Sequence, residues 1–153
     1  MRWVPKNTWR FSVLSKPKAQ PRAKATAWGG KARMWTPNTA EAFKQSIALA
    51  AREAIGLGCI PIKAPVETIC VFYMPRPKRL MTKSTIGIDE IPHICKPDGD
   101  NLEKAVWDAL KSGGVLRDDC IVFKSSKAKF YAEADGIPRV EIMVIEYGEA
   151  SNG

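Results

Sequence analysis

The chain has 153 residues, a length typical of one domain with its own core. Hydrophobic residues make up 45% and charged residues 26%, as in ordinary globular proteins and unlike disordered chains. No stretch reaches the roughly 18 apolar residues of a membrane span, and no apolar run of a secretory signal follows Met1. We therefore expect a single domain over residues 1–153, located in the cytoplasm, with no membrane partner.

The net charge of +8 is concentrated in the first quarter of the chain. The first 40 residues contain nine bases and no acid, whereas the other 113 residues have a net charge of −1. A second basic cluster covers Arg76 to Arg79. Such segments favour a polyanion, through phosphate contacts and the release of counterions. The prolines and glycines between Lys16 and Arg33 argue against a membrane-binding amphipathic helix and leave nucleic acid as the favoured partner.

The N-terminal half predicts one strand, one long loop and one helix. Alternating residues predict a strand over residues 9–14, and a segment rich in proline, glycine and lysine predicts a flexible basic loop over residues 15–35. Thr36-Pro37 is typical of a helix start, and Gly56 is typical of a helix end.

The second half predicts a strand, a helix and two more strands. β-branched and aromatic residues predict a strand over 66–74, stopped by Pro75 and followed by a second flexible loop over 76–96. A helix over 101–111 follows from its apolar stripe, which consists of Leu102, Ala105, Val106, Ala109 and Leu110. Strands are expected over 120–131 and 139–147, with a polar tail over 148–153. The order β-α-β-α-β-β predicts an α+β fold, with a mixed sheet packed on the two helices.

The four cysteines do not form a zinc site by their spacing, because no CxxC pair exists. His93-x-Cys95 is the single metal-like pair and has no second half. We expect free thiols, as in a reducing compartment.

Clustered carboxylates flank the second helix. Asp98 and Asp100 are predicted at its N-terminal end, with Asp100 near the cap position, and Asp118-Asp119 follow its C-terminal end. A cap explains one aspartate, but close carboxylates repel by about 4 kcal/mol per pair at an effective dielectric constant of 20. If the chain reverses at Gly113-Gly114, the groups converge on a divalent cation, for which oxygen ligands suit Mg²⁺ or Mn²⁺. An EF-hand does not fit this register.

These residue types indicate phosphodiester hydrolysis. Lys104 lies one turn after Asp100, either as half of a surface ion pair or as an ammonium group beside a metal-bound phosphate. Carboxylates with a divalent cation activate water for this reaction, and the basic loops suit a nucleic-acid substrate. The single histidine, His93, argues against a histidine-based nucleophile, and without a P-loop no nucleotide cofactor is expected.

The segment from Lys96 to Leu110 reads KPDGDNLEKAVWDAL and is followed by GVLRDD, ending at Asp119. This pattern resembles the signature of the RusA family of Holliday-junction resolvases, and the resemblance extends over most of residues 9–147. It implies a small homodimer that binds four-way DNA junctions and nicks them in symmetric pairs with Mg²⁺, for which Mn²⁺ can substitute. It assigns metal binding to Asp98, Asp100 and Asp119, and an essential basic role to Lys104.

The resemblance also implies a setting and a DNA surface. The setting is recombination and repair in a bacterium or a phage-infected host, with a phage or prophage gene. Two alternatives stay open: an endonuclease with broader taste for branched DNA or flaps, and a junction-binding protein without activity. The residues expected to contact DNA are bases of the two loops and their neighbours: Lys16, Lys18, Arg22, Lys24, Arg76, Lys78, Arg79, Lys96 and Lys127.

Overall fold

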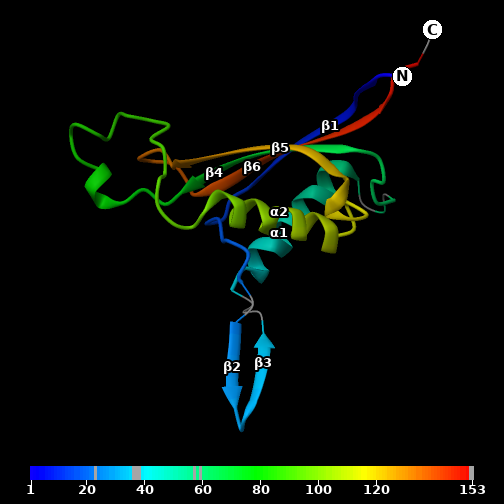
Figure 1. Cartoon of the computed structure of the whole chain (residues 1–153). Coiled ribbons are helices and arrows are strands. Elements are labelled where there is room, and N and C mark those ends of the chain that lie inside the picture. The colour runs from blue at the N-terminus through cyan, green and yellow to red at the C-terminus, as the bar shows by residue number, and fades with distance from the viewer. Residues whose placement is uncertain (23, 36–38, 57, 59, 152–153) are drawn as a thin grey trace.

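The computed structural model describes residues 1–22, 24–35, 39–56, 58 and 60–151. It has the α+β fold that the element order predicts (Figure 1). Two single-turn 3₁₀ helices, η1 (Lys78–Leu80) and η2 (Asp119–Ile121), accompany the main elements. The main elements are β1 (Trp3–Val13), β2 (Lys24–Trp28), β3 (Lys31–Trp35), α1 (Glu41–Ile55), β4 (Val66–Met74), α2 (Gly99–Ser112), β5 (Val122–Tyr131) and β6 (Arg139–Glu149).

Four strands form a mixed sheet in the order β1-β6-β4-β5. The β4–β5 pair is parallel, and β6 pairs antiparallel with both β1 and β4. Both helices lie on one side of this sheet (Figure 1). Because β4 and β5 are parallel, the chain must cross over between them, and α2 is that crossover. The prediction of a mixed sheet packed on two helices is confirmed.

The core lies between the sheet and the helices. Every residue of the predicted apolar stripe of α2 is fully buried, and Phe43 and Ile47 of α1 join it against Phe72 of β4. Lys44 connects the two helices, since its Nζ lies 2.8 Å from Asp108 Oδ2 and 2.9 Å from Glu41 Oε1. Neither helix, among the described residues, is long and apolar enough to cross a membrane.

The two end strands are longer than their local patterns predict. β1 begins at Trp3, six residues before the predicted start, because its first half pairs with the end of β6. Trp3 is opposite Glu149, and Val4 is opposite Gly148, so the predicted polar tail is wrong for residues 148–149. Pro5 is tolerated because β1 is an edge strand, and the register shifts after it.

The predicted loop over residues 15–35 contains a β-hairpin, which corrects the prediction. β2 and β3 pair antiparallel through Gly29 and Gly30, whose φ angles of 62° and 76° suit a tight hairpin turn. The hairpin projects away from the sheet and helices (Figure 1). The predicted helix start at Thr36-Pro37 lies outside the described residues, and the helix itself begins at Glu41.

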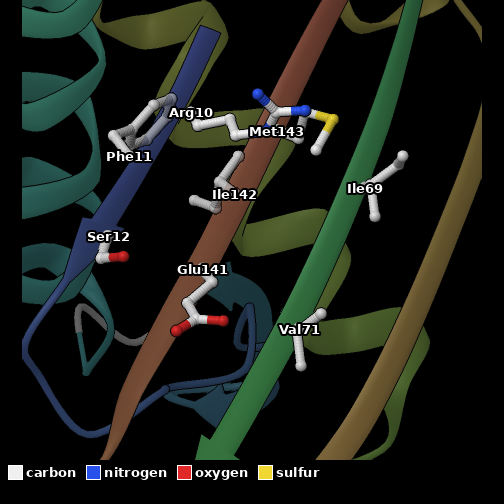
Figure 2. A pocket seen from close by; sticks show the side chains of 8 residues that line it. All are labelled: Arg10, Phe11, Ser12, Ile69, Val71, Glu141, Ile142 and Met143. Carbon is white, nitrogen blue, oxygen red and sulfur yellow. The ribbon is translucent and has the colours of Figure 1, made fainter.

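The sheet face opposite the helices is open. Figure 2 looks onto this face, where Arg10, Ile69, Val71, Glu141 and Met143 project from β1, β4 and β6. They belong to the lining of a shallow pocket that is mostly apolar. Asp98 and Asp100 lie at the start of α2, and this helix is behind the sheet in this view. The site that the sequence predicts is therefore not on this open face.

Candidate active site

The N-terminal end of α2 presents two of the predicted aspartates. Asp98 is the N-cap residue, with extended backbone, and its carbonyl oxygen accepts a hydrogen bond of 3.1 Å from Leu102 N. Its carboxylate makes no capping hydrogen bond. Asp100 lies in the first turn, two residues after the cap, as the sequence predicts for a position near the helix start. Both side chains are exposed, and the positive helix end favours negative charge there.

Lys127 of β5 reaches across to the carboxylates of Asp100 and Glu103. Its Nζ lies 3.0 Å from Asp100 Oδ1 and 3.5 Å from Glu103 Oε1. Gly99 leaves the room for it, because a Cβ at that position would lie 3.2 Å from Lys127 Cδ. The hydrogen bond to Lys127 lowers the pKa of Asp100, and the same contact raises the pKa of Lys127. The predicted DNA contact at Lys127 is thus part of the acidic end of α2.

Glu103 is a site residue that the sequence reasoning missed. Its side chain is 5% exposed, and its Oε2 has no hydrogen-bond partner among the described residues. The sequence motif has a variable position at residue 103, so the pattern did not single out Glu103 as a site residue. Lys127, which β5 brings over the first turn of α2, contacts the other oxygen of this carboxylate. A buried carboxylate oxygen without a partner is costly and favours a cationic neighbour.

Lys104 lies on the exposed side of the first turns of α2. Its charge contributes to the lowered pKa of Asp100, after the larger effect of Lys127. The predicted proximity of Lys104 and Asp100 is therefore present. Lys127, rather than Lys104, makes the direct contact with the Asp100 carboxylate. The ammonium group of Lys104 is therefore available for a phosphate.

The segment that leads into Asp98 is held along the edge of β5. His93 N donates to Lys129 O at 3.0 Å, and Tyr131 N donates to Ile91 O at 2.9 Å. The Nζ of Lys129 donates to Cys95 O at 2.8 Å and to Pro97 O at 2.7 Å. Lys129 was not predicted, although its two-residue spacing from Lys127 places both lysines on one face of the strand. It fixes the carbonyl groups on the approach to Asp98.

Removing the Lys129 ammonium group tests whether cleavage requires the segment before Asp98 to be held in place. We expect Lys129→Gln to lower the cleavage rate by about 10-fold to 100-fold, the usual cost of losing a group that orients a site. Lys124→Gln, which removes an exposed lysine from the same strand, serves as the matched control. Initial rates of DNA cleavage, with circular dichroism to verify folding, measure the effect. Equal rates for the two variants would contradict a role for Lys129.

Asp118 and Asp119 lie at the other end of α2. Asp118 Oδ1 accepts from Asp119 N at 2.7 Å and lies 3.5 Å from Lys111 Nζ. The two carboxyl groups hydrogen-bond to each other, which lowers the pKa of Asp118 and raises that of Asp119. A helix of 14 residues is about 21 Å long, so this pair is far from the Asp98 end.

The predicted convergence of the three aspartates does not occur within one chain. Across the described part of the chain, no group of three or more His, Cys, Asp and Glu side chains is placed to hold a metal ion. The reversal at Gly113-Gly114 occurs, but β5 begins beside the far end of α2 and only its later residues return to Asp100. One chain therefore offers suitable oxygen donors but not a complete ligand set.

Exposed bases surround the Asp98 end. Arg22 and Lys96 line an open pocket together with Pro97, Asp98 and Asn101. The backbone of Gln20 donates to Asn101 O at 2.9 Å, which ties the basic N-terminal segment to the start of α2. The hairpin follows directly from this anchored segment. Lys16 and Lys18 lie exposed before the hairpin, and Lys24, also exposed, is the first residue of β2.

Comparison with known proteins supports the family resemblance that the acidic motif indicates. The family described as Endodeoxyribonuclease RusA matches residues 15–145, which include the hairpin, both helices and the acidic pairs. The chain belongs to the RusA endodeoxyribonuclease family. It is also 34% identical over 147 residues to the Bacillus subtilis (strain 168) "Uncharacterized protein YqaN", a match that covers 90% of this chain and 95% of that protein.

Like Lys127, two more of the predicted DNA contacts in this RusA-family chain are engaged within the chain. The Arg76 guanidinium donates to the carbonyl groups of Leu80, Ile88 and Thr85, and so holds the loop after β4. Arg79 donates to Tyr131 OH at 3.1 Å. Lys78 is exposed beside them. Arg76 is thus a loop anchor, and the bases near Asp98 are the more accessible of the predicted DNA contacts.

Proposed function

We propose that this RusA-family protein is a Mg²⁺-dependent, structure-selective endodeoxyribonuclease that resolves Holliday junctions by paired, symmetric nicking. The observation that carries the proposal is the start of α2, where Asp98 lies beside Arg22 and Lys96 in an open pocket and Asp100 pairs with Lys127. Carboxylates for a cation next to bases for phosphates are what phosphodiester hydrolysis requires. The proposed setting is recombination and repair in the cytoplasm, with a phage or prophage gene.

The proposed metal ligands are Asp98, Asp100 and Asp119, with Mn²⁺ able to replace Mg²⁺. Their oxygen atoms suit these hard cations. A bound divalent cation would activate a water molecule and stabilise charge on the phosphate. Lys104 would contact the phosphate oxygens, and Lys127 would hold Asp100 in place through the contact of 3.0 Å.

Removal of the metal tests this part directly. We expect EDTA to stop cleavage completely and added Mg²⁺ or Mn²⁺ to restore it. The readout is the appearance of nicked strands from a labelled junction on a denaturing gel. Cleavage that continues after dialysis against EDTA would contradict a role for a divalent cation.

A homodimer supplies what one chain lacks. Two symmetric cuts need two sites related by a two-fold axis. If that axis relates two α2 helices in antiparallel orientation, the Asp119 end of one chain lies beside the Asp98 end of its partner. The two incomplete halves would then form two complete sites. This arrangement accounts for the separation of the carboxylates within a single chain.

The basic segment is proposed to contact the DNA backbone. We expect neutralisation of four bases together, Lys16, Lys18, Arg22 and Lys24 to Gln, to weaken junction binding and to flatten its salt dependence. The slope of log affinity against log salt should fall by about 0.9 for each phosphate that the variant no longer neutralises. Gel-shift titrations at several salt concentrations measure it, with Lys6→Gln/Lys63→Gln as a control. An unchanged slope would assign the segment to solubility alone.

A broader branched-DNA or flap endonuclease is the second candidate, with the same chemistry. A junction-binding protein without activity is disfavoured by the exposed carboxylates, because they repel phosphates and a pure binder gains affinity by losing them. Cleavage of junctions, flaps and linear duplexes in parallel separates the three possibilities.

A further inference from the structure

Cys95 belongs to a group of side chains that the proposed nuclease chemistry does not use. Its Sγ lies 3.4 Å from His93 Nε2 and 3.7 Å from Tyr131 OH. Cys95 is exposed, whereas His93 is 7% exposed and packs edge-on against the Tyr131 ring. A thiol therefore lies at the surface with an imidazole ring fixed behind it.

The orientation of His93 is set by its surroundings. Its backbone N–H is bound to Lys129 O, and its ring is 4.9 Å from the Tyr131 ring between centroids. The Nδ1 atom has no partner among the described residues, so Cys95 is the contact that the ring makes through Nε2. In the tautomer with the proton on Nδ1, Nε2 accepts the proton of the thiol.

Two basic side chains bind groups next to the thiol. The Arg79 guanidinium carbon lies 5.8 Å from the Tyr131 ring centroid, and its NH2 group donates to the Tyr131 hydroxyl that contacts Cys95. The Lys129 ammonium is bound to the carbonyl group of Cys95 itself. A neighbouring imidazole and nearby basic side chains are the surroundings in which reactive cysteines are found.

The other described cysteines lack this environment. Cys70 is buried, and burial raises the pKa of its thiol to about 12, which makes it inert. Cys120 is exposed like Cys95, but among the described residues its sulfur has no hydrogen bond like those of Cys95 with His93 and Tyr131. Cys120 is therefore a matched reference for surface exposure.

We propose that Cys95 and His93 form a reactive thiol–imidazole pair, a modification site for hydroperoxides and related soft electrophiles. His93 Nε2 accepts the thiol proton as the sulfur attacks the distal oxygen of the peroxide, and it passes the proton to the departing oxygen. A sulfur–oxygen bond forms and the oxygen–oxygen bond breaks. Sulfur is oxidised by two electrons to the sulfenic acid, and the peroxide is reduced to water or an alcohol.

The position of Cys95 connects this site to the segment that leads into Asp98. Cys95 lies three residues before Asp98, and Lys129 holds the carbonyl groups of Cys95 and Pro97 together. An added group on the sulfur disturbs the contacts with His93 and Tyr131, and thus the path of this segment. Modification of Cys95 therefore switches off cleavage. This last step rests on the proposed function.

The labelling rates of individual cysteines test the pair without any nuclease assay. The folded protein is treated with limiting iodoacetamide, and peptide mass spectrometry follows each cysteine with time. We expect Cys95 to react about 10-fold faster than Cys120. His93→Gln and, because His93 is buried, also the exposed Arg79→Gln should slow Cys95 several-fold and leave Cys120 unchanged. Equal rates for Cys95 and Cys120 in the unaltered protein would overturn the proposal.

Treatment with peroxide tests whether modification of Cys95 stops DNA cleavage. Brief treatment with hydrogen peroxide should reduce junction cleavage by about 10-fold, and dithiothreitol should restore it, because the sulfenic acid is reducible. Cys95→Ser should resist the treatment, whereas Cys120→Ser should respond like the unaltered protein. If Cys95→Ser loses activity equally, the coupling is wrong. If the untreated protein cuts no DNA, the proposed function fails while the labelling result stands.

Discussion

Replacement of Asp100 by asparagine is expected to abolish junction cleavage and to preserve or tighten junction binding. The change removes one carboxylate from the proposed cation site, and it removes a negative charge that repels the DNA backbone. It also releases Lys127, whose Nζ is 3.0 Å from Asp100 Oδ1, for contact with phosphate. We expect the cleavage rate to fall by at least about 100-fold, the upper range for residues that merely support a metal site.

Two measurements on the same preparation check this expectation: the cleavage rate with Mg²⁺ and the junction affinity without metal. Asp135→Asn is the matched control, because it makes the same charge change at an exposed turn between β5 and β6. Circular dichroism verifies the fold. Loss of binding in a folded Asp100→Asn protein would show that the carboxylate serves the DNA surface, and the metal assignment would be wrong.

Mixing two inactive variants is expected to restore activity if the sites are shared between chains. Asp100→Asn and Asp119→Asn remove carboxylates from opposite ends of α2. In a mixed dimer one site would contain both substitutions and the other would contain neither. With random assembly, about a quarter of all sites would be intact, because a two-fold dimer has two equivalent sites. The restored product should be a single nick per junction.

The control for this experiment is a mixture of Asp98→Asn and Asp100→Asn, which lie at the same end of α2 and should stay inactive together. Native mass spectrometry measures the fraction of mixed dimers. If mixed dimers form and the Asp100→Asn/Asp119→Asn mixture stays inactive, the three aspartates do not combine across the two-fold axis. The ligand set would then have to form within one chain, by movement of η2.

Much of the fold could be predicted because its signals are local. The spacing of Leu102, Ala105, Val106, Ala109 and Leu110 predicts one buried helix face, and all five are fully buried. The start of β1 and the end of β6 depend on pairing between the two ends of the chain, which local alternation does not contain. The β2–β3 hairpin was not predicted, because the proline, glycine and lysine of this segment indicated a loop. Gly29-Gly30 is nevertheless a hairpin turn signal.

The candidate site likewise has some features that local sequence predicts and others that depend on contacts between distant segments. The motif predicts that Asp98 and Asp100 lie at the start of α2, as they do. The contacts from β5 depend on strand order, since Lys127 and Lys129 reach α2 and its preceding loop only because β5 lies at that edge of the sheet. The expected convergence with Asp119 was wrong for one chain because η2 starts at the far end of the helix.

The most direct test of the proposed function is cleavage of a labelled, immobile four-way junction beside a matched linear duplex, each with Mg²⁺ or with EDTA. We expect paired nicks at symmetric positions in the junction only, and only with Mg²⁺. Tight junction binding without any cut in Mg²⁺ or Mn²⁺ would contradict the proposal and would favour a binding protein or a different branched substrate.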